Sequence, residues 1–276
     1  MTERFAADWL ALREPFDHSA RSIALARRLA DVLPRRPRVL DLGAGTGSMF
    51  RFLAPIIGRG QDWILLDADA ALLDEAFGHT AAWARRRHFA AMADQDELRV
   101  TTPQGLWRLQ AMAGDLSRFN SEQANVDAIV CSALLDLVSA AWLSRFCTHL
   151  RVPFLACLTA DGRDVWRPRH AYDALVRSAF RRDMRRDKGF GSALGISAAH
   201  AFMHAASAPS EWRIPRTALR MQRALIDGTA DAARNANPAR AGAIGAWQEA
   251  RLHQALRGRL AITIGHRDIL VLPPGG

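Results

Sequence analysis

The chain has 276 residues, of which 49% are hydrophobic, and its formal net charge is +9. This size and apolar content suffice for one large α/β domain or two small ones. The positive charge would ordinarily suggest a nucleic acid as partner. However, Lys188 is the only lysine and the arginines are spread from Arg4 to Arg267, a skew typical of a GC-rich coding sequence. A nucleic-acid partner is therefore possible but not favoured.

Membrane and secreted proteins are also disfavoured. The N-terminus has acids at Glu3 and Asp8 and no long apolar run, so it does not predict a signal peptide. The longest apolar stretch, residues 128–144, is interrupted by Asp136, which argues against a membrane span. The cysteines have no metal-ligand spacing and are typical of reduced thiols. We expect a cytoplasmic protein without a metal site.

The first predicted elements are two amphipathic helices within residues 5–33, which end before Pro34 and Pro37. Residues 38–50, RVLDLGAGTGSMF, then predict a buried strand, a glycine-rich loop and a helix. Glycine allows the backbone of such a loop to approach a ligand closely. The first turn of the helix offers unpaired N–H groups to that ligand. This stretch therefore predicts a small-molecule site.

The spacing of the glycines argues against a dinucleotide. A dinucleotide-binding loop has the pattern G-x-G-x-x-G/A. Here the glycines fall G-x-G-x-G, and Asp41 stands two residues before the first of them. A carboxylate at this position would repel a pyrophosphate and suit a cationic ligand. The stretch VLDLGAGTG resembles the first motif of the class I S-adenosylmethionine-dependent methyltransferases, [V/L]LD[L/V]GxGxG, and matches it at every position.

The resemblance implies a fold and a cofactor. The fold is α/β: a seven-stranded, mostly parallel sheet with helices on both faces and an antiparallel last strand. The cofactor is S-adenosyl-L-methionine, covered by an N-terminal helical lid in which Arg13 or Arg21 reaches the methionine carboxylate. The alternative for these arginines is a solvated helix face, or pairing with Glu14 and Asp17.

The second strand is predicted at residues 62–67, DWILLD, followed by a long helix over residues 68–87. Asp67 closes this strand about twenty residues after the loop and is placed to accept hydrogen bonds from both ribose hydroxyls. Asp69 is the alternative ribose ligand, but we expect it to cap the helix.

Residues 97–115 predict a strand, a turn and a second strand that ends at Asp115. The resemblance implies that Asp115 accepts a hydrogen bond from the adenine amino group and that the backbone N–H of Leu116 donates one to the adenine ring. The residues expected at the cofactor are Arg13, Asp41, Gly43, Ala44, Gly45, Gly47, Asp67, Ala68, Asp115, Leu116 and Ser132.

The strand predicted at residues 126–132 faces the methyl group in the resemblance. Families that methylate amides of bases or proteins carry [N/D/S]PP[Y/F] there, whereas this chain has Cys-Ser-Ala-Leu at residues 131–134. This difference counts against N-methylation of a base. Asp136 is a candidate catalytic base, and the other interpretation is an acid at a helix start.

A fifth strand is predicted at residues 152–159, followed by a helical insertion over residues 161–200 that covers the substrate. His170 in this insertion is our preferred base for a hydroxyl acceptor, with a purely structural histidine as the alternative. Tyr172 and His200 are further candidates. Four aromatic residues could wall the substrate pocket: Trp166, Tyr172, Phe180 and Phe190.

The remaining residues predict a strand at residues 200–214, two amphipathic helices at residues 215–234 and 238–257, and a terminal antiparallel strand at residues 260–272. We expect a single domain in four parts. These are the N-terminal lid (1–36), the cofactor-binding core (37–160), the substrate cover (161–200) and the C-terminal part of the sheet (201–276).

The expected activity is transfer of a methyl group from S-adenosylmethionine to an oxygen, nitrogen or carbon of a small molecule. Two alternatives remain. One is an RNA methyltransferase that uses an arginine-rich surface, and the other is a non-catalytic module that binds S-adenosylmethionine. The sequence leaves the acceptor and the oligomeric state open.

Overall fold

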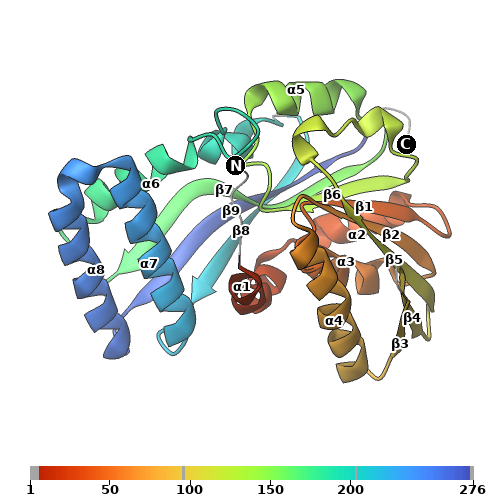
Figure 1. Ribbon diagram of the computed structural model, residues 1–276, viewed down its shortest axis with the longest axis horizontal. Helices are drawn as coiled ribbons and strands as arrows, with labels where there is room; N and C mark the ends of the chain where they lie inside the picture. Colours follow the sequence, from red (N-terminus) through yellow and green to blue (C-terminus); the bar gives the residue numbers. More distant parts are fainter. Residues whose placement is uncertain (1–5, 95–96, 203, 274–276) are drawn as a thin grey trace.

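The computed structural model describes residues 6–94, 97–202 and 204–273. One sheet of nine strands runs through it in the order β3-β4-β5-β2-β1-β6-β7-β9-β8 (Figure 1). The strands are β1 (Arg38–Leu42), β2 (Gln61–Asp67), β3 (Ala90–Ala93), β4 (Glu97–Thr102), β5 (Gly105–Ala113), β6 (Ala128–Ser132), β7 (Phe154–Arg167), β8 (Ala206–Ile214) and β9 (Ala261–Val271). The helices are α1 (Ala7–Ala20), α2 (Ile23–Val32), α3 (Ser48–Ile57), α4 (Ala70–Arg86), α5 (Ala140–His149), α6 (Asp173–Met184), α7 (Leu219–Ala236) and α8 (Ala241–Leu256), and short 3-10 turns lie between them.

The α/β class is confirmed, but the prediction of seven mostly parallel strands is wrong. The pairs from β5 through β2, β1 and β6 to β7 are parallel, whereas β3, β4, β8 and β9 join the sheet through antiparallel pairs. Strand β3 escaped prediction because Ala90–Ala93 continues the alanine-rich composition of α4. The expected antiparallel last strand is β9, which lies between β7 and β8.

Strand β7 is longer than the sequence indicated. It extends to Arg167 instead of ending at residue 159, because it pairs with β9 along its length across two register shifts. Its second half includes the polar run Asp161–Gly162–Arg163–Asp164, whose composition is typical of a loop. The first seven residues of the expected helical insertion, 161–167, are therefore strand. Helix α6 occupies the middle of that insertion, and β8 begins at Ala206 instead of residue 200.

The hydrophobic core has two layers, one on each face of the sheet, at the end that carries the glycine-rich loop. Side chains of α2, α3 and α4 pack on one face, with Val39 and Leu65 from the strands. Side chains of α5 pack on the other face, with Leu40 and Ile64. Successive residues of a strand point to opposite faces, so a fully buried parallel strand carries apolar residues almost without interruption.

A third apolar cluster lies at the far end of the long strands, where α6, α7 and α8 cover β7, β8 and β9 (Figure 1). Trp166, Trp212 and Trp247 are its largest members, and Arg251 lies buried among them. We call the half of the sheet that carries the glycine-rich loop the cradle half, and the half covered by α6, α7 and α8 the distal half. Within the described ranges, we find no helix that has both the length and the apolar character to cross a bilayer.

Candidate active site

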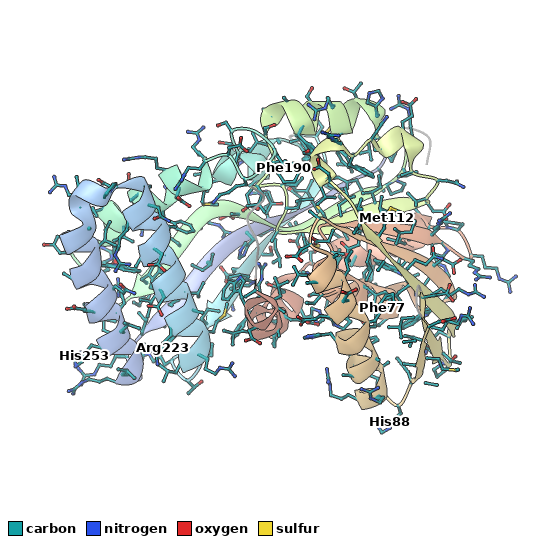
Figure 2. The ribbon with its side chains drawn as sticks, viewed as in Figure 1. Phe77, His88, Met112, Phe190, Arg223 and His253 are labelled. Atoms are coloured by element: carbon teal, nitrogen blue, oxygen red, sulfur yellow. The ribbon has the colours of Figure 1, made fainter. Side chains whose placement is uncertain are left out.

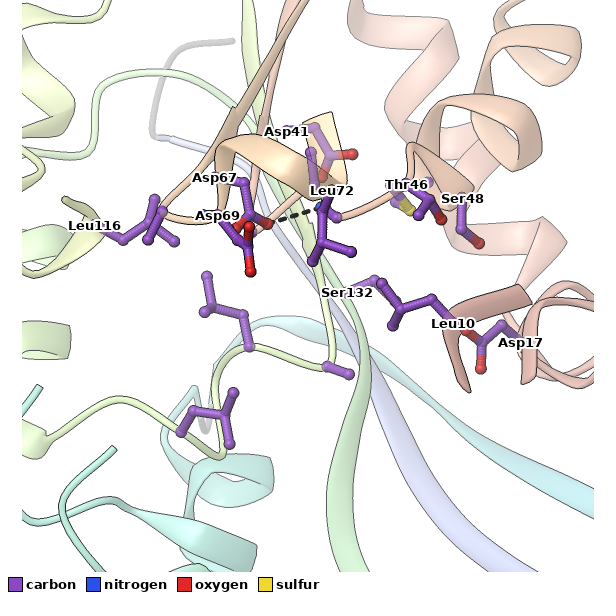
Figure 3. Close-up of a pocket in the computed structure, with 18 of the residues that line it drawn as sticks. Leu10, Asp17, Asp41, Thr46, Ser48, Asp67, Asp69, Leu72, Leu116 and Ser132 are labelled. Atoms are coloured by element: carbon purple, nitrogen blue, oxygen red, sulfur yellow. Dashed lines mark hydrogen bonds between the residues drawn. The ribbon is translucent and has the colours of Figure 1, made fainter. Parts of the chain in front are cut away.

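A cavity of about 610 Å³ opens where β1, β2 and β6 end. Small-molecule sites in proteins commonly enclose about 300–1,000 Å³. Figure 3 shows Asp41, Asp67 and Asp69 together on its wall, with Leu116 and Leu10 toward opposite sides of the view. The described residues that line the cavity are Leu10, Arg13, Asp17, Arg21, Asp41, Gly43, Ala44, Gly45, Thr46, Ser48, Met49, Asp67, Ala68, Asp69, Leu72, Leu116, Ser132, Ala133, Leu134, Leu137, Lys188 and Phe190.

The glycine-rich loop adopts backbone angles that favour glycine. Gly43, Gly45 and Gly47 have φ values of 68°, 51° and 81°, in the left-handed region that is costly for other residues. A Cβ at Gly45 would lie 3.0 Å from Cδ1 of Leu10 in α1. A side chain at these glycine positions would be strained, so the side chains that the loop brings to the cavity are those of Ala44 and Thr46.

Asp67 ties the loop to the second strand. Its Oδ2 accepts a hydrogen bond from the N–H of Gly45 at 2.8 Å, which Figure 3 marks, and its Oδ1 accepts one from the N–H of Asp69 at 2.9 Å. Burial raises the pKa of Asp67, while these two N–H groups act in the opposite direction. A carboxylate can accept about four hydrogen bonds, so Asp67 keeps acceptor capacity toward the cavity. Asp69 caps α4, as predicted, through the N–H of Ala71 at 3.1 Å.

Asp41 is the most unusual group of the site. It is 1% exposed, and neither carboxylate oxygen has a hydrogen-bond partner among the residues that the structure describes. Burial raises the pKa of Asp41 to about 8, an effect that the Arg21 guanidinium partly offsets and the Asp67 carboxylate reinforces. A buried carboxylate without partners is costly. The site is therefore arranged for a group that would donate to Asp41 and neutralise it.

Helix α1 contributes two arginines to the opposite wall. Arg21 is buried, and it donates to the Ser132 hydroxyl at 2.9 Å and to the Ser48 carbonyl at 3.2 Å. Arg13 donates to both oxygens of Asp17, at 3.2 and 3.0 Å, and its guanidinium lies 4.8 Å from the ring centroid of Trp212. The sequence left open whether these arginines face a ligand or pair with acids. The structure shows that both arginines pair with Asp17, Arg13 at 3.0 Å and Arg21 at 3.9 Å, and that both line the cavity.

Nine of the eleven residues expected at the cofactor line this cavity, and Gly47 and Asp115 do not. Gly47 is the N-cap of α3, just behind the lining. The carboxylate of Asp115 is more than half exposed and accepts from the N–H of Ser117 at 2.9 Å. This hydrogen bond lowers the pKa of Asp115. Its neighbour Leu116 does line the cavity.

The two residues expected to be catalytic, His170 and Asp136, are not among the lining residues. The first lies between the end of β7 and the start of α6, where its backbone N–H donates to Asp173 at 2.9 Å and its ring lies 5.6 Å from that of Tyr172. It lies there because β7 extends to Arg167 and carries the segment toward the distal half. Of the four aromatic residues expected at the substrate, only Phe190 lines the cavity.

Several lining residues were not singled out by the sequence. Leu10 and Leu137 are ordinary apolar residues on amphipathic segments, and nothing in the pattern marks them as facing a ligand. Lys188 did carry a signal, because it is the only lysine in a chain with 37 lysines and arginines combined. Nothing else in the sequence marks Lys188 as a residue that faces a ligand.

No protein-family model and no curated protein sequence matches this chain. Solved structures do resemble it. A putative type II methyltransferase from Anaeromyxobacter dehalogenans has 17% identity and a TM-score of 0.48 over 92% of this chain and 97% of its own. A SAM-dependent methyltransferase from Geobacter sulfurreducens, in complex with S-adenosyl-L-homocysteine, has 16% identity and a TM-score of 0.44 over 97% and 98%. YjhP from Escherichia coli has 15% identity and a TM-score of 0.45 over 99% and 95%. The first two are methyltransferases by name.

Proposed function

We propose that the protein transfers the methyl group of S-adenosylmethionine to a small-molecule acceptor. The observation that carries this proposal is the buried carboxylate of Asp41, to which the described residues donate no hydrogen bond. This carboxylate lies on the wall of a cavity beside the glycine-rich loop. A cationic ligand would stabilise this carboxylate, whereas a dinucleotide would bring a pyrophosphate against Asp41, Asp67 and Asp69. S-adenosylmethionine carries both an ammonium and a sulfonium group.

The lining residues fit this cofactor from end to end. Asp41 would accept from the ammonium group, and Arg21 would pair with the methionine carboxylate. Asp67 would accept from the ribose hydroxyls, and Leu72 and Leu116 would pack on the adenine. When bound, the cofactor supplies a methyl group on a positively charged sulfur, which a nucleophile attacks. The protein contributes alignment of the two reactants and exclusion of water.

The lining beyond Ser132 favours a small acceptor over RNA. An RNA substrate requires an open basic groove with stacking surfaces for its bases. Here the lining residues that follow β6, Ala133, Leu134 and Leu137, are all apolar, and Leu10 and Phe190 add to them; the charged lining residues nearby are Arg13, Asp17, Arg21 and Lys188. The non-catalytic alternative predicts the same cofactor affinity without turnover.

Calorimetric titration with S-adenosylmethionine and S-adenosylhomocysteine tests the proposal. We expect heat of binding from both, and a loss of at least about tenfold in affinity in Asp67→Ala, or about 1.4 kcal/mol, because the ribose loses its acceptor. Asp62→Ala is the matched control: it lies on the same strand, and its carboxylate pairs with Arg36 and Arg108. Absence of binding heat, or equal affinities in Asp67→Ala and wild type, would contradict the proposal.

A further inference from the structure

One wall of the cavity combines a lysine with apolar side chains, and Arg13 and Arg21 line the cavity as well. The members of this wall are Leu10, Leu134, Leu137, Lys188 and Phe190. In a chain that otherwise uses arginine as its strong cation, the single lysine lies at this wall. A lysine ammonium is a compact point charge with three donors, whereas a guanidinium is a broad planar fork, so the two are not interchangeable in a confined site.

Lys188 is held in place by a fixed segment. Its Nζ lies 3.5 Å from Oδ2 of Asp183, and the same carboxylate accepts from Arg186 at 3.1 Å. Two cations thus share one carboxylate. The Lys188 side chain is 14% exposed, which limits screening of its charge by solvent.

The residues that follow Lys188 are fixed as well. Oδ1 of Asp187 accepts from the N–H groups of Gly189 and Gly191, at 2.7 and 2.9 Å. The ring of Phe190 meets that of Trp142 in α5 edge to face, with centroids 6.0 Å apart, and Figure 2 labels it just below α5. This segment is therefore a built wall that places an ammonium and an aromatic ring at one cavity.

The described lining residues include no histidine, cysteine, tyrosine or glutamate. Four aspartates are present, and the contacts above give each another role. Asp17 accepts from Arg13, Asp67 holds Gly45, Asp69 caps α4, and Asp41 lies at the end of the site assigned to the cofactor. An alcohol or thiol acceptor must lose a proton as it reacts, and this wall offers no group for that task.

We propose that the acceptor is a carboxylic acid with an apolar body, held at Lys188 and methylated on its carboxylate; this inference rests on the proposed function. A carboxylic acid is already ionised at neutral pH, so it needs no base. A carboxylate oxygen forms a bond to the methyl carbon while the carbon–sulfur bond breaks and its electron pair stays on sulfur. The products are a methyl ester and a neutral thioether, and no proton is transferred. The apolar wall removes water from the nucleophile, and Lys188 orients it.

The test uses the full chain and four acids as probes: butyrate, octanoate, 3-phenylpropanoate and benzoate, with octanol, octylamine and octanethiol as matched controls. Methyl transfer from S-adenosylmethionine labelled in its methyl group is followed by mild alkali, which releases methanol from an ester but not from an ether, an amine or a thioether. We expect label in methanol for at least one acid and none in the products of the controls. Label only in the controls, or no alkali-labile label from any acid, would overturn the inference.

Variants then assign the role of Lys188. We expect Lys188→Met to lower kcat/KM for the accepted acid by at least about tenfold, the loss typical of a hydrogen bond to a charged group, and Lys188→Arg to recover part of it. The same acid should bind the protein loaded with S-adenosylhomocysteine, as measured by saturation-transfer NMR, and Lys188→Met should abolish this signal. Arg186→Met is the matched control, because Arg186 shares Asp183 but does not line the cavity.

The calorimetric results separate the two proposals. If S-adenosylmethionine does not bind, the proposed function fails. If it binds and no acid is methylated, only the assignment of the acceptor fails. If Lys188→Met weakens the binding of S-adenosylhomocysteine instead of the acid, Lys188 belongs to the cofactor and the inference is wrong.

Discussion

Two buried carboxylates of the sheet, one on β1 and one on β9, have opposite surroundings. Asp41 on β1 has no hydrogen-bond partner for either oxygen. Asp268 on β9 is 0% exposed and accepts from three donors: the N–H of Ser22 at 2.6 Å, the N–H of Leu158 at 2.8 Å and the hydroxyl of Ser210 at 3.0 Å. Burial raises the pKa of both groups, and for Asp268 the three donors act against it.

The difference separates a structural carboxylate from one held for a ligand. Asp268 joins the start of α2, the middle of β7 and β8, so its charge is used within the fold. Asp41 is equally buried and stabilises nothing in the protein, and a group of this kind is retained only where function requires it. The comparison therefore favours Asp41 as the ligand-binding acid, because the described residues donate no hydrogen bond to its carboxylate.

The largest expected effect is on stability, at Asp268. Asp268→Ala leaves three donors unsatisfied, and because each costs about 1–3 kcal/mol, we expect the free energy of unfolding to fall by about 3–5 kcal/mol in urea denaturation. Asp231→Ala is the control, since that exposed acid pairs only with Arg234, and it should change stability by no more than about 0.5 kcal/mol. Equal losses of stability in Asp268→Ala and Asp231→Ala would show that the Asp268 carboxylate is not a structural one, and so would contradict its contrast with Asp41.

Asp41 should show the reverse pattern, with binding affected and stability preserved. Asp41→Asn resembles the protonated acid, which burial favours, so we expect no loss of stability at neutral pH. Affinity for S-adenosylmethionine should fall by about 10- to 100-fold, because a hydrogen bond between charged groups is lost. Calorimetry and urea denaturation of the same preparation measure both. A large loss of stability with unchanged affinity would make Asp41 structural.

The last expected effect is spread over a range of pH. In the folded protein the pKa of Asp41 is about 8, well above its value in an unfolded chain, so between the two values the folded state holds a proton that the unfolded state has released. The stability contributed by this proton is complete at low pH and is lost as pH rises toward 8, with a slope of up to about 1.4 kcal/mol per unit.

Urea denaturation at several pH values between about 5 and 8 isolates this contribution. Relative to wild type, Asp41→Asn should gain stability as the pH rises, because it lacks the titrating group. Binding of S-adenosylmethionine to wild type near neutral pH should also release a proton, detectable by calorimetry in buffers of different ionisation enthalpy. Parallel pH profiles for the two proteins would show that Asp41 does not titrate in this range.

The cradle half could be predicted from sequence because its signals are local. The loop, Asp67 and the cap at Asp69 all follow from a strand, a turn and a helix that are adjacent in the chain. The distal half could not, because the length of β7 depends on pairing with β9 about one hundred residues later. The polar residues 161–164 carry no strand pattern of their own. The position of His170, just beyond the end of β7, depends on the same pairing with β9. The lining role of Lys188 likewise depends on distant contacts.

The position of β9 has a consequence for how the protein folds. It is the last strand along the described chain, yet it lies between β7 and β8, and its Asp268 contacts Ser22 across 246 positions of sequence. In the described sheet β8 joins through β9, and the ladder of β7 is likewise incomplete until β9 has paired with it. We therefore expect closure of this part of the sheet to be a late and slow step of folding, as is usual where the decisive contacts are distant in sequence.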